Sequence, residues 1–309
     1  MTNAVVTGYK GFSRGMRGIS GKQYKENTLF VEDKAVIYKA GMHFCKNPIT
    51  MLYYCPPVDD PDCISEYAKV EAYDNVYTED NYEFCTRALF IGKRLSYEKL
   101  CDEIIRYTIS SNETNIFYNT EDHGIIGTSD NYSTVDSSGR SCISCTGGYY
   151  GIVICNGFQS IASNSGDYGI ADCRADSSIA GNAGCHGVAN SNGDFSVAIT
   201  SEYGSIACSR GYCNIACSSG SYSAANNCGR YGIAVACNKY SVSSVSGKKS
   251  LAVGFGKNNK VKGSLGSWIV CAEWDNEKPI DCKLALVDGT KIKADTFYKL
   301  EKGEFVEVK

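Results

Sequence analysis

Two short segments near the N-terminus hold the residues whose types and spacing could do chemistry. The first is Tyr9-Lys10-Gly11-Phe12, and the second, Gly41 to Pro48, reads Gly-Met-His-Phe-Cys-Lys-Asn-Pro. Histidine transfers protons near neutral pH, and a lysine or tyrosine side chain can hold an anion or a hydroxyl group. The candidate catalytic residues are therefore Tyr9, Lys10 and His43, with Glu71 as an acidic partner.

These two segments resemble, in part, the strands that hold nicotinamide in ADP-ribosyltransferases. Their layout is similar to the tyrosine-arginine-glycine strand of that fold and to its later strand of aromatic and small residues. Lys10 stands in place of the arginine, the serine motif is absent, and neither Glu71 nor Glu79 forms a recognisable catalytic pair. The resemblance implies an NAD-binding or degenerate module, and NAD is a cofactor only under this alternative.

His43 and Cys45 could also form a base and a thiol nucleophile. A spacing of two on a strand places both side chains on one face, and a thiolate needs a nearby proton acceptor. The sequence offers no recognisable orienting carboxylate or oxyanion loop beside them. We therefore interpret His43 as a structural histidine.

Metal binding is not expected. Cys142 and Cys145 form a Cys-x-x-Cys pair, but no second close pair with the spacing of a tetrahedral site follows. Nine-residue β-coils that bind calcium need a regularly placed aspartate, whereas Asp167, Asp176 and Asp194 are sporadic. These aspartates are expected to be solvated corner residues.

The middle of the chain is a nine-residue repeat of the form Gly-x-Tyr-(Ser/Gly)-Ile-Ala-x-(Ser/Asn/Cys)-(Ser/Asn). It places one aliphatic column, Ala224 being its smallest member, at Ile143, Ile152, Ile161, Ile170, Ile179, Val188, Val197, Ile206, Ile215, Ala224, Ile233, Val242 and Leu251. A fixed period of this length predicts a β-solenoid, in which each unit buries its apolar face against the next. Extending the register backward adds Ile116, Ile125 and Thr134.

The geometry of the coil remains open at this point. Two units would give an 18-residue coil, with Cys155 stacked on Cys173, and three units would give a 27-residue coil. The recurrent glycines mark corners that need a positive φ or a close backbone approach. On a straight strand Tyr150 and its equivalents share a face with the aliphatic column, whereas a bend would turn the alanines inward instead.

The flanking segments predict two further modules. Residues 1–95 read as an α+β module with strands at 35–38, 70–73 and 88–91 and a helix begun by Pro48. Residues 96–111 read as an amphipathic helical connector capped by Ser96. Residues 112–254 form the solenoid, and 255–309 form a β-rich cap with strands at 267–273, 283–287, 291–294 and 305–308 and a hairpin turn at Asp288-Gly289. The predicted fold class is mainly β.

Composition narrows the function classes. The 309 residues carry a net charge of -3, which supplies no basic field for nucleic acid. No apolar stretch approaches the ~20 residues that cross a bilayer, and residues 1–10 lack the apolar core of a signal peptide. An odd count of 17 cysteines without such a signal favours free thiols in a reducing compartment. We therefore expect a cytoplasmic protein that binds neither nucleic acid nor membrane.

Three strings taken together resemble an uncharacterised family of phage and prophage proteins. They are the Gly41–Pro48 string, the nonapeptides, and the ending Gly-Ser-Leu-Gly-Ser-Trp-Ile-Val at 263–270. The similarity spans nearly the whole chain and implies an origin in a mobile element. It implies no particular chemistry.

The leading hypothesis is a non-enzymatic binding protein of the infected bacterial cytoplasm, a homo-oligomer that counters host defence by blocking or sequestering a host protein or a nucleotide signal. One alternative is an ADP-ribosyltransferase-like NAD-binding enzyme in the N-terminal module, and another is a virion or fibre component. An anionic ligand between subunits would first be sought at the basic residues of the repeat region, which are otherwise solubilising charges: Arg174, Arg210, Arg230, Lys248 and Lys249.

Overall fold

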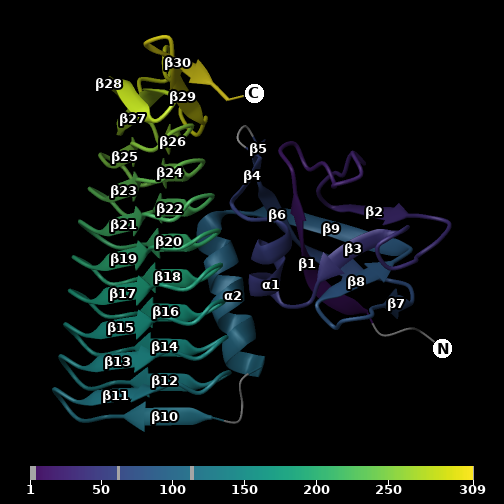
Figure 1. The fold of residues 1–309 in the computed structure, drawn as a ribbon, viewed down its shortest axis with the longest axis horizontal. Coiled ribbons are helices and arrows are strands. Elements are labelled where there is room, and N and C mark those ends of the chain that lie inside the picture. Colours follow the sequence, from purple (N-terminus) through teal and green to yellow (C-terminus); the bar gives the residue numbers. More distant parts are fainter. Residues whose placement is uncertain (1–4, 61–62, 112–114, 309) are drawn as a thin grey trace.

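The computed structural model describes residues 5–60, 63–111 and 115–308. It is mainly β, with an upright solenoid, a small α+β module packed on one side of it, and a β cap above (Figure 1). The solenoid start expected at residue 112 lies outside the described residues. The first coil strand that is described begins at Ile116.

The N-terminal module is one twisted antiparallel sheet with a short helix against it. Its strand order is β2-β9-β6-β1-β3-β8-β7, and a two-stranded β4-β5 ribbon follows the helix. Its elements are β1 (Val6–Phe12), β2 (Thr28–Val31), β3 (Met42–Cys45), α1 (Pro48–Tyr54), β4 (Val58–Asp60), β5 (Cys63–Ile64), β6 (Glu66–Ala72), β7 (Val76–Tyr77), β8 (Glu83–Thr86) and β9 (Ala88–Leu95).

Local sequence explains where the helices begin. The side chain of Asn47 accepts the N–H of Ile49, and Pro48 occupies the first turn of α1, where no N–H is needed. Ser96 caps α2 (Tyr97–Ser111) through the N–H of Lys99. The strand expected at 35–38 is wrong, because that segment is a turn closed by a bridge between Val36 and Ala40.

The solenoid has two sides and a coil of 18 residues. Strands pair in parallel with the strand 18 residues away, and Cys155 lies directly beside Cys173. One side of each coil belongs to a sheet that we call the even sheet, because its coil strands have even numbers. These strands are β10 (Ile116–Asn119), β12 (Thr134–Ser137), β14 (Ile152–Cys155), β16 (Ile170–Cys173), β18 (Val188–Ser191), β20 (Ile206–Ser209), β22 (Ala224–Asn227), β24 (Val242–Val245) and β26 (Lys260–Gly263). The 27-residue alternative is wrong.

The odd sheet forms the other side of each coil. Its parallel strands are β11 (Ile125–Thr128), β13 (Ile143–Thr146), β15 (Ile161–Asn164), β17 (Ile179–Asn182), β19 (Val197–Thr200), β21 (Ile215–Ser218), β23 (Ile233–Ala236), β25 (Leu251–Gly254) and β27 (Trp268–Asp275). Parallel pairing therefore continues past residue 254, the boundary expected from the fading repeat.

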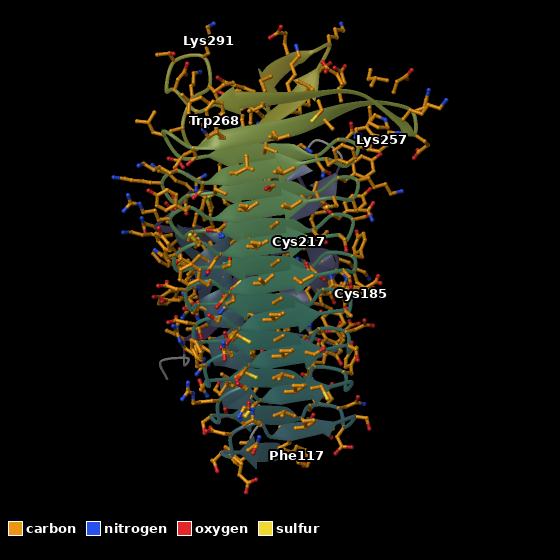
Figure 2. The ribbon with its side chains drawn as sticks, turned by 90° about the vertical axis from the view of Figure 1, so that its left-hand side faces the viewer. Phe117, Cys185, Cys217, Lys257, Trp268 and Lys291 are labelled. Atoms are coloured by element: carbon orange, nitrogen blue, oxygen red, sulfur yellow. The ribbon has the colours of Figure 1, made fainter. Side chains whose placement is uncertain are left out.

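The alanine column, not the isoleucine column, fills the inside of the coil. Ala162, Ala171 and Ala180 are fully buried between the sheets, together with serine and asparagine side chains that bond the backbone of neighbouring coils. The isoleucines point outward. On the even sheet those from Ile152 to Ile206 are covered by the N-terminal module, whereas Ile116 at the start of that sheet is exposed. The odd sheet has an open outer face (Figure 2), on which Ile161 keeps 37% of its surface exposed.

Most corner glycines are required by close approach rather than by a positive φ, which in this column is found at Gly211 with φ 92°. A Cβ added to Gly157 would lie 1.7 Å from the carbonyl oxygen of Gly139 in the preceding coil, so only glycine fits there. The positive φ falls two residues later, on the tyrosine column, where Tyr150 has φ 55° and Tyr168 has φ 56°. These tyrosine rings stack on one another from coil to coil.

The cap closes both sheets with antiparallel strands. β28 (Lys278–Leu286) extends the odd sheet, while β29 (Tyr298–Glu301) and β30 (Glu304–Glu307) extend the even one. The strand expected at 291–294 is wrong, and Asp288-Gly289 does not join two paired strands, because the hairpin turn lies between β27 and β28. Asp288 instead accepts the N–H groups of Thr290 and Ile292.

Candidate functional site

A cleft opens in the N-terminal sheet where two neighbouring strands diverge. β1 pairs with β6 along its whole length, but with β3 it shares a single bridge, between Tyr9 and Cys45. Beyond that bridge the strands separate, and a cavity of about 540 Å³ lies between them. Cavities of this size hold small-molecule ligands. The sequence segments singled out above, Tyr9 to Phe12 and Gly41 to Cys45, form its walls.

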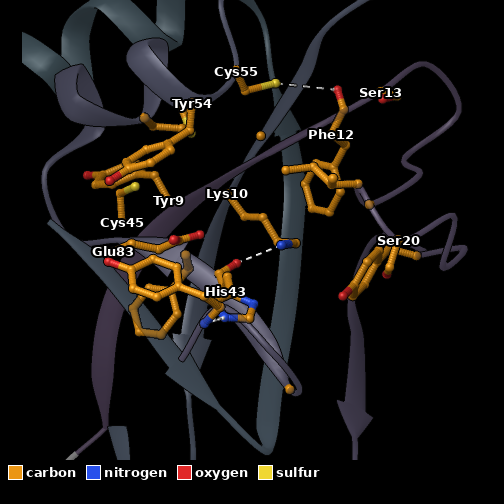
Figure 3. A pocket seen from close by; sticks show the side chains of 18 of the residues that line it. Tyr9, Lys10, Phe12, Ser13, Ser20, His43, Cys45, Tyr54, Cys55 and Glu83 are labelled. Carbon is orange, nitrogen blue, oxygen red and sulfur yellow. Dashed lines mark hydrogen bonds between the residues drawn. The ribbon is translucent and has the colours of Figure 1, made fainter. Parts of the chain in front are cut away.

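Lys10 lies in the gap between the two strands. Its Nζ donates to the carbonyl oxygen of His43, 2.6 Å away, a backbone group that the diverging strand β1 leaves unpaired (Figure 3). The same ammonium is 5.4 Å from the centre of the Tyr24 ring and 5.7 Å from that of Phe12. Burial lowers the pKa of Lys10 from its ordinary value. An anion entering the cleft would restore what this ammonium has lost in solvation.

His43 is held neutral beside this cation. Its Nε2 accepts the backbone N–H of Tyr38 at 3.0 Å, which requires an unprotonated nitrogen there. Burial, and then the positive charge of Lys10, lower the pKa of His43. The ring is therefore uncharged at neutral pH, with Nε2 accepting from Tyr38 and Nδ1–H left as its donor, which bonds the backbone of Gly41.

Aromatic rings and three carboxylates complete the walls. The rings of Phe12, Tyr24 and Tyr54 line the cavity together with Glu32, Asp59 and, at the start of β8, Glu83. Burial raises the pKa of Glu83. Gly41 enters β3 with φ 91°, and a Cβ there would lie 2.7 Å from the Cys85 sulfur, so glycine is required at this wall.

Three of the four candidate catalytic residues lie at this cleft. Tyr9, Lys10 and His43 line it, but the Tyr9 hydroxyl donates to Glu103 of α2 at 2.6 Å and so helps to join the module to the helix. Glu71 lies on β6, outside the residues that line the cavity, and accepts the Tyr73 hydroxyl at 2.6 Å. The acidic groups that line the cleft are Glu32, Asp59 and Glu83.

Sequence reasoning singled out Tyr54, in the Tyr53-Tyr54 pair that follows Pro48, but missed Glu32, Asp59 and Glu83. Glu83 faces the cleft because β8 pairs with β3, which places it opposite Cys45. Nothing in the sequence shows that β8 is the neighbour of β3.

The thiol hypothesis is not favoured by the environment of Cys45. This side chain is 4% exposed, and burial raises the pKa of its thiol to about 12. Such a thiol is protonated at neutral pH and is a poor nucleophile. Cys45 therefore acts as a small packing residue of the core beneath the cleft.

A second cavity, of about 470 Å³, lies between α2 and the even sheet. Arg174 lines it and donates through Nε to Asp172 at 2.8 Å, and Asn190 donates to the other oxygen of that carboxylate at 2.7 Å. The positive charge of Arg174 is thus already balanced by Asp172 within this cavity.

The other basic candidates of the solenoid lie in two separate places. Arg210 binds α2, donating to Asp102 at 2.6 Å and to the carbonyl oxygen of Glu98 at 3.0 Å. Arg230 and Lys249 lie over the Tyr231 ring, and Lys248 is an exposed corner residue. These five cations therefore do not converge on one site.

The corner aspartates hold one coil to the next. The carboxylates of Asp167, Asp176 and Asp194 accept the backbone N–H of the residue 18 positions later, at 2.7 to 2.9 Å. In the Cys-x-x-Cys pair, Cys142 is buried and Cys145 is exposed. Across residues 5–60, 63–111 and 115–308, no three histidine, cysteine or acidic side chains gather as metal ligands would.

Comparison with known proteins gives one match. A family model described as "Domain of unknown function (DUF7666)" matches residues 6–103, which span the N-terminal sheet, the cleft and the first half of α2. No curated protein and no solved structure matches the chain. Within the described residues, none of the helices has the length and apolarity needed to span a bilayer. The matched domain is therefore the one that carries the cleft.

Proposed function

We propose that the protein is a non-enzymatic binding protein whose N-terminal cleft holds a nucleotide. The observation that carries the proposal is the divergence of β1 and β3 after the Tyr9–Cys45 bridge, which leaves Lys10 inside a cavity of about 540 Å³. The family model matches residues 6–103 and so ends within α2, before the coil strands begin. This supports a role for the N-terminal module that is separate from the solenoid.

The chemistry of the walls favours a nucleotide over other small molecules. The Lys10 ammonium can bind a phosphate. Burial lowers its pKa because it has lost water, so a phosphate that binds there stabilises a cation that is already desolvated. The rings of Phe12, Tyr24 and Tyr54 offer stacking surfaces for a planar base. The carboxylates of Glu32, Asp59 and Glu83 can accept hydrogen bonds from ribose hydroxyls or exocyclic amino groups.

The solenoid serves as the scaffold of this module. A continuous apolar core joins α1 and α2 to the outward isoleucines of the even sheet, including Ile152, Ile170 and Ile206. Arg210 adds a charged link to Asp102. A cleft attached to a rigid rod in this way keeps its shape when it is empty, which favours binding.

The biological form of the proposal is sequestration. The resemblance to phage and prophage proteins favours a protein that acts in the cytoplasm of an infected bacterium and withdraws a nucleotide signal from host defence. Blocking of a host protein is the other form of this hypothesis.

Calorimetric titration tests the proposal with ADP-ribose as the probe. Adenosine lacks the phosphates and ribose 5-phosphate lacks the base, so both should bind at least about tenfold more weakly. Lys10→Met should weaken ADP-ribose binding by about tenfold or more, since a charged hydrogen bond contributes about 1.5–3 kcal/mol. Lys34→Met is the matched control, because Lys34 is exposed and lies outside the residues that line the cleft. Equal binding by both variants would contradict the proposal.

One second function is favoured by a specific observation. Tyr9, Lys10 and His43 meet at a cleft between diverging strands, with Glu83 as an available carboxylate. That grouping supports the alternative of an NAD-consuming enzyme. Incubation of the protein and a bacterial lysate with labelled NAD should then release nicotinamide and label a product, and Glu83→Gln should abolish both. Binding of NAD without release of nicotinamide would contradict the enzyme alternative and leave sequestration as the remaining proposal.

A further inference from the structure

The odd sheet presents an uncharged apolar face along the solenoid. Its outward side chains form two columns, one at the first and one at the third position of each strand, in unbroken register from Ile125 to Trp268. Among these outward residues none is charged. Figure 2 looks onto this face, with Cys217 near its centre.

The same kind of face is covered on the other side of the molecule. On the even sheet the first-position residues Ile152, Ile170, Val188 and Ile206 have 0% exposure, because the N-terminal module packs on them. On the odd sheet Ile143, Ile161 and Ile179 keep 41%, 37% and 40% of their surface. Parallel sheets normally have both faces covered. The chain itself therefore covers one face and leaves the other for a partner.

The sizes of the third-position residues differ between the two halves of the odd sheet. From β11 to β17 this column is small: Gly127, Cys145, Ser163 and Gly181. From β23 upward it is bulky: Val235, Val253, Val270 and, on β28 opposite Val270, Leu284. Ile199 and Cys217 lie between the halves.

We propose that a second copy of this chain covers the odd sheet, related by a two-fold axis that runs parallel to the strands between β19 and β21. This rotation reverses the rod and places the third-position columns face to face. Gly181 then meets Val235 of the other copy, Ser163 meets Val253, and Cys145 meets Val270. Ile199 meets Cys217, and Gly127 meets Leu284. Every pair joins a small residue to a branched one, which is the self-complementarity of an isologous interface.

The area is sufficient for a dimer. Ten strands spaced by about 4.8 Å give a face about 43 Å long, and four residues at about 3.3 Å each give a width of about 13 Å. Each copy would then bury on the order of 560 Å², or about 1,100 Å² for the pair before the corner residues are added. A specific interface needs about 1,000 Å² or more. Two such uncharged sheets would pack about 10 Å apart.

Light scattering after size exclusion tests the proposal on the full chain. We expect a dimer at micromolar concentration, and Ile199→Lys should convert it into a monomer, because it places a charge in the apolar interface beside the axis. Gln159→Lys, at an exposed corner of the same solenoid, should remain a dimer, and circular dichroism should show the same fold for both variants. A monomeric wild type, a dimeric Ile199→Lys variant, open polymers or a stoichiometric complex with another protein would each overturn the proposal.

Cross-linking tests the register. In Val270→Cys, a short bismaleimide should join residue 270 of one copy to Cys145 of the other, and peptide mass spectrometry identifies the pair; within one chain these residues are seven strands, or about 34 Å, apart, so this link can form only between copies. A dimer in which residue 270 is joined instead to residue 270 of the other copy would overturn the two-fold arrangement. The outcome is independent of nucleotide binding, because the cleft lies on the other side of the solenoid.

Discussion

His43 shows how one residue sets the state of the cleft. It accepts the N–H of Tyr38 and provides the carbonyl oxygen that holds Lys10 in place. The first bond requires an unprotonated ring, and the second is possible because β1 diverges from β3 and leaves that carbonyl oxygen free for Lys10. The pKa of His43 is lowered by burial and by Lys10, so the folded protein resists protonation at this site.

The fold should therefore lose stability in mild acid through His43. As pH falls through the unfolded-state pKa, the unfolded chain takes up a proton that the folded chain does not, and each pKa unit of difference costs about 1.4 kcal/mol. In His43→Gln the amide oxygen can accept the same N–H without titrating. Urea unfolding at pH 7 and pH 5 should show a larger loss for wild type than for His43→Gln. An equal loss in both would contradict this assignment.

At the scale of the coil, the corner glycines decide whether neighbouring turns can stack. A Cβ on Gly148 would lie 1.8 Å from the carbonyl oxygen of Asp130, whereas a Cβ on Gly147 would meet only the Ser165 hydroxyl, at 3.5 Å. The two residues are adjacent and neither has a positive φ. Substitutions at these two positions therefore test the effect of close backbone approach in the absence of a positive φ.

Gly148→Ala should destabilise the protein by about 2 kcal/mol or more, because the backbones of two coils must move apart. Gly147→Ala should change stability by no more than about 0.5–1 kcal/mol, the usual effect of alanine on the unfolded chain. Urea unfolding of the two variants gives the comparison. Similar stabilities would contradict the close-approach explanation.

The period predicted the coil but not its inside. Nine-residue spacing of Ile161, Ile170 and Ile179 fixed the register, and the 18-residue coil was one of two stated alternatives. Ile and Ala alternate and both are apolar, so the pattern does not say which one faces inward. The narrow two-sided coil is filled mainly by alanine, serine and asparagine, with larger side chains such as Val135 and Val261 toward its ends. The outward isoleucines reflect a second layer of packing, which a repeat pattern does not encode.

The cleft was predicted only in part, for a similar reason. Tyr9, Lys10 and His43 were recognised as chemically capable, but the cavity exists because β1 and β3 separate after one bridge. Strand divergence is a tertiary property. Glu83 could be assigned only once β8 was known to pair with β3.

At the scale of the whole molecule, the module and the rod are joined along α2. Apolar packing of Leu100 and Ile104 is supplemented by Arg210, which reaches from the solenoid to Asp102 and the Glu98 carbonyl oxygen. Arg230 lies over an exposed tyrosine ring on the solenoid. Arg230 is therefore a matched control for Arg210, because it is an arginine of the solenoid that does not link the N-terminal module to the rod.

Arg210→Met should loosen α2 by about 1–2 kcal/mol, because it removes charged hydrogen bonds at a partly exposed site. Hydrogen exchange of the α2 amides should become faster in this variant, while the coil strands on the odd sheet stay protected. Arg230→Met should leave α2 exchange unchanged. Unaltered exchange in Arg210→Met would show that apolar packing alone holds the module.

The claim that the N-terminal cleft is a nucleotide site is tested most directly by identifying what it retains. Wild type and Lys10→Met would each be incubated with bacterial lysate, repurified and extracted, and the released small molecules compared by mass spectrometry at equal protein amounts. We predict a nucleotide in near-stoichiometric amount from wild type and its loss from folded Lys10→Met. The same small molecules from both proteins, or none from either, would contradict the claim.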